Sequence, residues 1–145
     1  MVLMLAMAVS CHRKAIYSHY EPIDTDGWQR DDTLHFTVTQ IADSGYHHET
    51  LGLRANLSYP FTAISLIVRQ QTSVSGSLRC DTVMIGLIDS DGRPLGRGIS
   101  HFQYDVTLED IFLCAGDTLS IDVRHNMKRE DLPGITDIGL TIEKI

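Results

Sequence analysis

The stretch LSIDVRHNMKREDLPGITDIGLTI, residues 119–142, decides the fold class. Apolar and polar residues alternate in its first and last thirds. The alternating apolar residues are Leu119, Ile121 and Val123 in the first run and Ile138, Leu140 and Ile142 in the second. A period of two places these side chains on one face of an extended strand, so each run predicts a half-buried strand. Pro133 and Gly134 stand between the runs and are typical of a turn.

The rest of the chain repeats this pattern. Residues 34–38 and 51–57 alternate in the same way. Residues 64–68 and 83–88 are instead apolar on both faces, which predicts central strands covered on both sides. Residues 107–112 fit either one helical turn or the edge of a strand. Many short strands separated by turn residues predict an all-β fold, an antiparallel β-sandwich that is jelly-roll-like.

Length and charge narrow the classes of function. The 145 residues fit one domain, and 43% hydrophobic with 21% charged residues is ordinary for a globular protein. The net charge is −7, from 12 basic and 19 acidic residues. No cluster of Lys and Arg suits phosphate groups, so nucleic acid is not an expected partner. No apolar run reaches the roughly 18 residues of a membrane-spanning helix.

The amino terminus predicts a lipid anchor. Residues 1–10 read MVLMLAMAVS and are expected to be the remnant of a signal peptide. The small Ser10 before Cys11 resembles a bacterial lipobox, in which the Cys thiol is acylated by a diacylglyceryl group and palmitate becomes part of the mature lipoprotein. The alternative is a buried first strand or helix with a plain thiol at Cys11. Residues 11–30 are expected to be a tether and irregular lead, and residues 31–145 the β-sandwich domain.

The residues after Cys11 bear on localisation. An Asp in the next position would favour retention in the inner membrane, and His12 stands there instead. An acidic patch would favour export to the cell surface, whereas Arg13 and Lys14 are basic. The expected location is therefore the cell envelope, with the lipid anchored in the outer membrane and the body on its periplasmic face.

Two further cysteines, Cys80 and Cys114, leave two outcomes open. In an oxidising periplasm they can form a disulfide, and otherwise they remain buried free thiols. Neither has the spacing of a zinc or redox motif. The adjacent His47 and His48 point to opposite faces of a strand, so they do not bind one metal ion. We expect no metal and no cofactor.

Other motifs of catalysis or binding have simpler interpretations. Residues 89–92, Asp-Ser-Asp-Gly, begin like a calcium loop, but Arg93 and Pro94 interrupt it, so a hairpin turn is expected. No GxSxG nucleophile motif occurs, and nothing selects one pair of carboxylates, so no enzyme activity is expected. A set of aromatic residues supports the alternative of a carbohydrate-binding β-sandwich lipoprotein that would stack on a glycan. These aromatic residues are Trp28, Tyr17, Tyr20, Tyr46 and Tyr59.

The densest charged run, residues 124–131, has two interpretations. It is either a solvated loop or a contact surface for a protein partner, since loops often carry binding residues. The candidate partner-binding residues are His125, Asn126, Met127, Lys128 and Arg129.

Several short motifs, in their order along the chain, resemble the GldH family of gliding-motility lipoproteins. They are Cys11, Trp28, Tyr59-Pro60-Phe61, Asp81-Thr82, residues 87–96, Ala115-Gly116-Asp117, His125-Asn126-Met127-Lys128, Leu132-Pro133-Gly134-Ile135 and residues 137–144. Lys128 stands where the family usually has Arg, and Pro94 where it often has a bulky aromatic residue. The resemblance implies a non-catalytic lipoprotein of the outer membrane that acts as an anchored protein-interaction module. Its implied partners are envelope proteins of a gliding or secretion apparatus.

Overall fold

The regular elements of the described chain are all β-strands, which confirms the predicted all-β class. The computed structural model describes residues 14–39 and 41–145. The strands are β1 (Ala15–Pro22), β2 (Trp28–Gln29), β3 (Leu34–Val38), β4 (Gly45–Asn56), β5 (Ala63–Thr72), β6 (Leu78–Gly86), β7 (Arg97–Gly98), β8 (His101–Thr107), β9 (Ile111–Leu113), β10 (Leu119–His125), β11 (Asp131–Leu132) and β12 (Ile135–Lys144). No helix in the described residues is long and apolar enough to cross a membrane.

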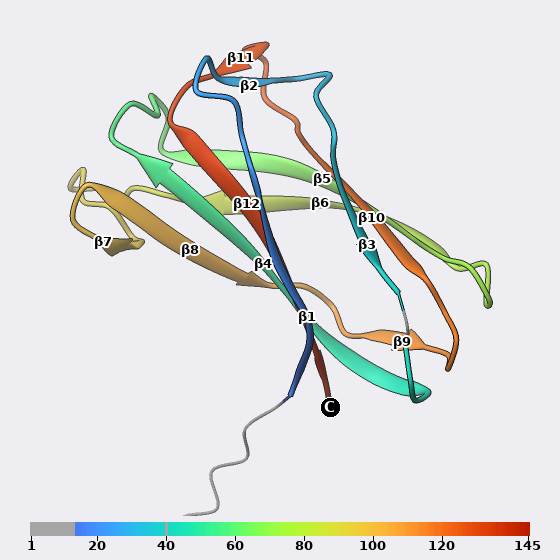
Figure 1. Cartoon of the computed structure of the whole chain (residues 1–145). Helices are drawn as coiled ribbons and strands as arrows, with labels where there is room; N and C mark the ends of the chain where they lie inside the picture. The colour runs from blue at the N-terminus through green and yellow to red at the C-terminus, as the bar shows by residue number, and fades with distance from the viewer. Residues whose placement is uncertain (1–13, 40) are drawn as a thin grey trace, which may run out of the picture.

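Two antiparallel sheets pack face to face (Figure 1). The larger has the order β1-β12-β4-β8-β7, with β9 paired to the start of β4, and the smaller has the order β3-β10-β5-β6. The chain crosses between the sheets from β3 to β4 and again from β4 to β5, which agrees with the predicted jelly-roll-like sandwich. A two-stranded ribbon of β2 and β11 lies at one end, at the top of Figure 1.

The core lies between the sheets and uses the predicted apolar positions. Buried and less buried residues alternate along β3 and β10, as expected for strands with one buried face. Completely buried side chains from both sheets meet there. They include Leu51 and Leu53 of β4, Ile64, Leu66 and Val68 of β5, Ile121 and Val123 of β10, and Ile138 and Ile142 of β12.

The prediction of two central strands is correct for one and wrong for the other. β5 lies between β10 and β6, as predicted for residues 64–68. β6 is instead the last strand of its sheet, and its Met84 is 68% exposed. An apolar run does not reveal whether a second strand will cover its free edge, because that depends on the order of the strands in the sheet.

The prediction of an irregular lead over residues 11–30 is wrong for the described part. β1 pairs with β12 from Ala15 to Pro22, and β2 pairs with β11. The β-structure therefore begins at Ala15, well before residue 31. Most side chains of β1 are exposed or half-exposed, so backbone hydrogen bonds hold it and no alternation marks it in the sequence. Cys11 and the expected signal remnant 1–10 lie outside the described residues.

Turn residues behave largely as predicted. The 89–92 segment is a turn in which the Asp89 carboxylate accepts hydrogen bonds from the backbone N–H groups of Asp91 and Arg93. Gly134 has φ of +89°, and a Cβ added there would lie 2.3 Å from the backbone nitrogen of Tyr59. Only glycine fits this position without strain. Residues 107–112 are extended at both ends of the stretch, with no helical turn.

Asp117 joins two neighbouring turns from a completely buried position. Its Oδ1 accepts hydrogen bonds from the Val74 N–H at 2.7 Å and the Ser73 hydroxyl at 3.2 Å, and its Oδ2 accepts one from the Cys114 N–H at 3.2 Å. Burial raises the pKa of Asp117, but these hydrogen bonds outweigh it and leave the pKa below its usual value of 3.8. The residue is therefore a structural carboxylate, charged at neutral pH.

Candidate functional site

The charged loop, residues 126–130, is anchored by a buried pair of aromatic rings. Trp28 and His125 are both completely buried, with ring centroids 5.3 Å apart in an edge-on arrangement. The Nε2–H of His125 donates to the backbone oxygens of Trp28 at 3.1 Å and Glu130 at 3.2 Å. Its Nδ1 accepts a hydrogen bond from the Met127 N–H at 3.3 Å. The imidazole thus fixes both ends of the loop to the ribbon of β2 and β11.

This hydrogen-bond pattern requires a neutral imidazole. Burial lowers the pKa of His125 below its usual 6.5, and the nearby positive charges of Arg30 and Arg124 act in the same direction. Hydrogen bonds to the carbonyl oxygens of Glu130 and Trp28 raise the pKa of His125, but they do not outweigh the effect of burial. A proton on Nδ1 would face the Met127 N–H, so protonation would break that hydrogen bond.

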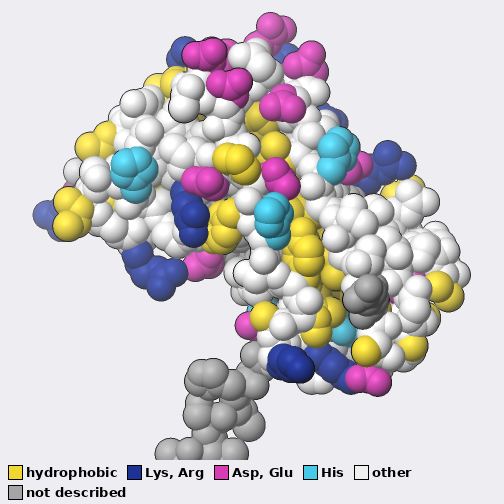
Figure 2. Space-filling model, in the orientation of Figure 1, with side chains coloured by type: hydrophobic (Ala, Val, Ile, Leu, Met, Phe, Trp, Pro, Cys, Tyr) yellow, Lys and Arg dark blue, Asp and Glu magenta, His cyan; other side chains and the backbone are white. Residues whose placement is uncertain are grey.

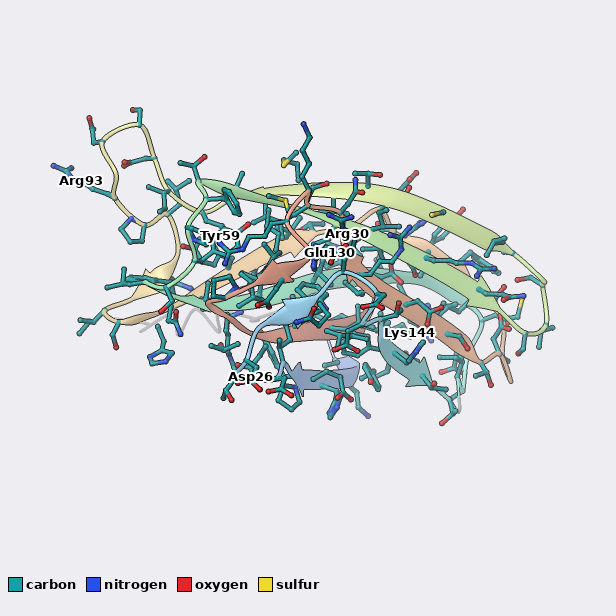
Figure 3. The ribbon with its side chains drawn as sticks, turned by 90° about the horizontal axis from the view of Figure 1, so that it is seen from above. Asp26, Arg30, Tyr59, Arg93, Glu130 and Lys144 are labelled. Carbon is teal, nitrogen blue, oxygen red and sulfur yellow. The ribbon has the colours of Figure 1, made fainter. Side chains whose placement is uncertain are left out.

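Arg30 fixes the loop backbone from outside. Its Nε donates to the Met127 oxygen at 3.1 Å, and a second guanidinium nitrogen donates to the Lys128 oxygen. Its own N–H donates to the Glu130 oxygen at 2.8 Å. Figure 3 shows Arg30 and Glu130 side by side at this end of the sandwich. The loop backbone is therefore held at several points although the side chains of Asn126, Lys128 and Arg129 are exposed.

The structure divides the five predicted partner-binding residues into two groups. Asn126, Lys128 and Arg129 are exposed and available for contact. His125 is completely buried, so its inclusion as a contact residue is corrected to an anchoring one. Met127 is half-buried, packs against the core, and its sulfur accepts a hydrogen bond from the Ser65 N–H at 3.4 Å.

An open pocket of about 440 Å³ lies beside this loop. Its lining residues are Gln29, Arg30, Asp31, Arg124 and Glu130. Gln29, Arg30 and Asp31 were not predicted from the sequence, because they come from a segment almost one hundred positions earlier in the chain. Charges of both signs line the pocket, which suits a polar protein surface better than an apolar ligand.

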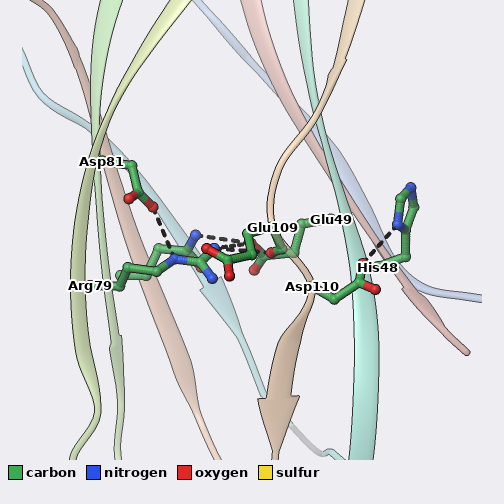
Figure 4. Close-up of polar contacts among 7 residues, drawn as sticks. His48, Glu49, Arg79, Asp81, Glu109 and Asp110 are labelled. Carbon is green, nitrogen blue, oxygen red and sulfur yellow. Dashed lines mark hydrogen bonds and ion pairs between the residues drawn. The ribbon is translucent and has the colours of Figure 1, made fainter.

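A second group of polar side chains lies between the sheets (Figure 4). Glu49 of β4 is completely buried, and its Oε2 accepts hydrogen bonds from Gln70 at 2.9 Å and from Arg79 at 3.0 Å. Arg79 also pairs with Asp81 at 2.9 Å. Burial raises the pKa of Glu49, and the Gln70 hydrogen bond and the Arg79 charge only partly compensate. Because Glu49 has no exposed surface, it cannot act as an acid or base on a substrate from solvent.

The buried aromatic residues contradict the predicted glycan platform. Trp28 is completely buried, and its indole N–H donates to the Asp32 oxygen at 2.9 Å. Tyr59 is 7% exposed, and the Arg54 guanidinium covers the ring of Tyr20 at 3.8 Å. Stacking on a sugar requires open ring faces, so Trp28, Tyr20 and Tyr59 cannot contribute to the predicted platform, whereas Tyr46 is exposed.

The cysteines and histidines do not form a shared site. Cys80 on β6 is exposed and Cys114 after β9 is half-buried, and both are free thiols, so the disulfide left open by the sequence does not form in this structure. His47 is buried, and the half-buried His48 pairs with Asp110 at 3.0 Å, so they face opposite sides of β4 as predicted. Over residues 14–39 and 41–145, no three His, Cys, Asp or Glu side chains are grouped to hold a metal ion.

Comparison with known proteins identifies similar sequences along nearly the whole chain. The GldH lipoprotein family model matches residues 15–142. The chain is 28% identical over 152 residues to gliding motility lipoprotein GldH of Flavobacterium johnsoniae, covering 99% of this chain and 94% of that protein. It is 24% identical over 144 residues to a gliding motility lipoprotein GldH homolog of Christiangramia forsetii, covering 93% and 87% respectively.

Among solved structures, the chain is similar to a CocE/NonD family hydrolase from Staphylococcus aureus. The sequences are 12% identical and the TM-score is 0.47, with 92% of this chain and 34% of the hydrolase covered. A likeness at this level carries no argument about function.

Proposed function

This chain belongs to the GldH lipoprotein family, and on that premise we propose that it is a non-catalytic, lipid-anchored interaction module of the outer membrane. Its relatives in Flavobacterium johnsoniae and Christiangramia forsetii are named as a gliding motility lipoprotein and its homolog. The family predicted from the sequence motifs is thereby confirmed. The proposed partners are envelope proteins of a gliding or secretion apparatus.

The proposed anchor is a lipid on Cys11. This residue precedes the first strand by four positions, so an acyl chain there would tether the sandwich directly, without a long linker. Stable anchoring needs two or more lipid chains, since each buried methylene contributes about 0.8 kcal/mol. The basic residues Arg13 and Lys14 after the Cys support the periplasmic face of the outer membrane as the location.

The proposed contact surface is the exposed part of the loop, Asn126, Lys128 and Arg129, with the neighbouring pocket. One observation carries this assignment: His125 and Arg30 fix the loop backbone while the three side chains stay exposed. A backbone that is already ordered loses little conformational entropy when a partner binds, which favours recognition. Glu49, in contrast, is completely buried and cannot contact a partner.

Site-specific photocrosslinking in intact cells tests this function. A photoreactive amino acid at Lys128 or Arg129 is expected to capture an envelope protein that mass spectrometry identifies. The same amino acid at Arg93 is the matched control, because Arg93 is also exposed but directly follows the 89–92 turn, apart from Arg30 and Glu130 in Figure 3. Capture at Arg93 alone, or no capture at the loop, would reject the loop as the contact surface.

A functional readout complements the crosslinking. The double variant Lys128→Glu and Arg129→Glu is expected to impair the family's motility or secretion phenotype while the protein remains folded and abundant. Normal motility and secretion in that variant would contradict the proposal.

A further inference from the structure

Exposed apolar side chains gather at the end of the larger sheet where β1 begins. We name this set the entry-end patch: Ile16 at 40% exposed, Tyr46 at 61%, Phe112 at 49% and Ile145 at 58%. Figure 2 shows hydrophobic side chains at this lower end of the molecule, from which β1 rises in Figure 1. A cluster of this kind differs from single apolar residues scattered on a surface, which need no explanation.

The four side chains come from neighbouring strands. Tyr46 and Phe112 lie opposite each other in the pairing of β4 with β9, with ring centroids 5.2 Å apart. The N–H of Ile145 donates to the Tyr46 oxygen at 3.2 Å. Ile16 lies where the register of β1 against β12 shifts. Because β1, β12, β4 and β9 are successive neighbours in the sheet, the four residues lie along one end of it.

Polar side chains border the patch. Lys144 pairs with Asp43 at 3.2 Å, and the His48 imidazole forms a hydrogen bond with Asp110 at 3.0 Å. The patch is thus an apolar, partly aromatic surface with a polar rim. Tyr and Phe side chains with this exposure suit the boundary between water and lipid headgroups, where an aromatic ring contacts apolar chains and a hydroxyl stays hydrated.

The chain between Cys11 and β1 is short enough for a lipid on Cys11 to hold this patch near a membrane. Ala15 lies four positions after Cys11, and a fully extended chain of four residues spans at most about 14 Å. Neighbouring strands are about 4.8 Å apart, so β9, three strands away from β1, lies only roughly 15 Å to the side. An acyl group on Cys11 would hold the whole end of the sheet close to the lipid headgroups.

We propose that the entry-end patch rests on the lipid surface and sets the orientation of the sandwich on the membrane. This inference depends on the proposed lipidation of Cys11. It also places the charged loop, residues 126–130, far from the lipid. β12 begins near that loop and ends at the patch, and its ten residues extend roughly 33 Å. The patch fixes the body to the membrane, and the loop at the opposite end is presented to partners.

A tryptophan placed in the patch reports directly on this contact. The full-length protein is purified from the cell envelope as Phe112→Trp and reconstituted in vesicles of phosphatidylethanolamine and phosphatidylglycerol with or without brominated acyl chains. The matched control is Leu57→Trp, which is 73% exposed in wild type and directly follows the opposite end of β4. The native Trp28 is completely buried, so wild type provides the background.

The intact mass of each preparation is measured first, which separates the anchor from the patch. With a lipidated protein, the added fluorescence of Phe112→Trp is expected to fall about twofold or more in brominated vesicles while Leu57→Trp is unaffected. A lipidated protein in which neither reporter is quenched, or both are quenched equally, would overturn the membrane contact and leave the anchor intact. An unmodified Cys11 would overturn the anchor and this inference together.

Discussion

Replacing His125 with Ala is expected to destabilise the fold and to remove the hydrogen bonds that hold the charged loop, residues 126–130. The imidazole satisfies two carbonyl oxygens and one N–H group, and its ring packs edge-on against Trp28. Leaving buried polar groups unpaired costs about 1–3 kcal/mol, and an aromatic pair contributes about 0.5–1.5 kcal/mol beyond burial. The free energy of unfolding should therefore fall by about 2–4 kcal/mol.

The assay is urea unfolding followed by the fluorescence of Trp28, which is the single tryptophan and lies against the mutated ring. His125→Phe separates the two contributions, because it keeps an aromatic ring and removes the hydrogen bonds. It should lose about 1–3 kcal/mol. His101→Ala is the control, since His101 is exposed and its loss should change stability by less than about 0.5 kcal/mol.

The pH dependence gives a second, independent readout. The pKa of His125 is lowered in the folded state, so the unfolded state binds the proton more tightly. The stability associated with the neutral ring is complete above pH 6.5 and is lost as the pH falls through 6.5 towards the lowered pKa. Wild type should lose stability over this range relative to His125→Phe. Equal pH profiles, or a His125→Ala variant as stable as wild type, would refute the anchoring role.

Three further substitutions test other parts of the fold by urea unfolding. Gly134→Val should lower the free energy of unfolding by at least about 1–3 kcal/mol, because its φ of +89° and the nearby Tyr59 backbone exclude a side chain; Gly86→Ala, whose Cβ meets only an ordinary contact, should cost far less. Burial raises the pKa of Glu49, so the stability of wild type relative to Glu49→Gln should fall as the pH rises through 4.5 towards the raised pKa, and a constant difference would contradict this. Asp117→Ala should lose about 2–4 kcal/mol by leaving main-chain N–H groups unpaired. Because the pKa of Asp117 is lowered, wild type should also lose that advantage as the pH falls below 3.8, and an advantage that persists in acid would count against the assignment.

The strands that could be predicted from the sequence are those that bury every second side chain. β3 and β10 must place every second side chain in the core, and the alternation of residues 34–38 and 119–123 records this requirement. β1 was not predictable in the same way, because backbone hydrogen bonds to β12 hold it and most of its side chains face solvent. The edge position of β6 was also hidden, since an apolar run does not specify the order of strands in a sheet.

The candidate site was predictable only in part for a similar reason. The density of charge in residues 124–131 predicted an exposed loop, and Asn126, Lys128 and Arg129 are exposed, whereas their role as contact residues stays a prediction. The burial of His125 against Trp28 joins residues 97 positions apart, and the Arg30 contact with Met127 spans the same separation. Such contacts follow from the pairing of β2 with β11 and leave no local pattern in the sequence.

The proposed membrane anchor depends directly on the chemistry of Cys11. Mass spectrometry of the native protein extracted from the envelope should find Cys11 as the first residue, carrying a diacylglyceryl thioether and a further acyl chain. A peptide that continues through Ser10 into a free Cys11 thiol would contradict the lipid anchor.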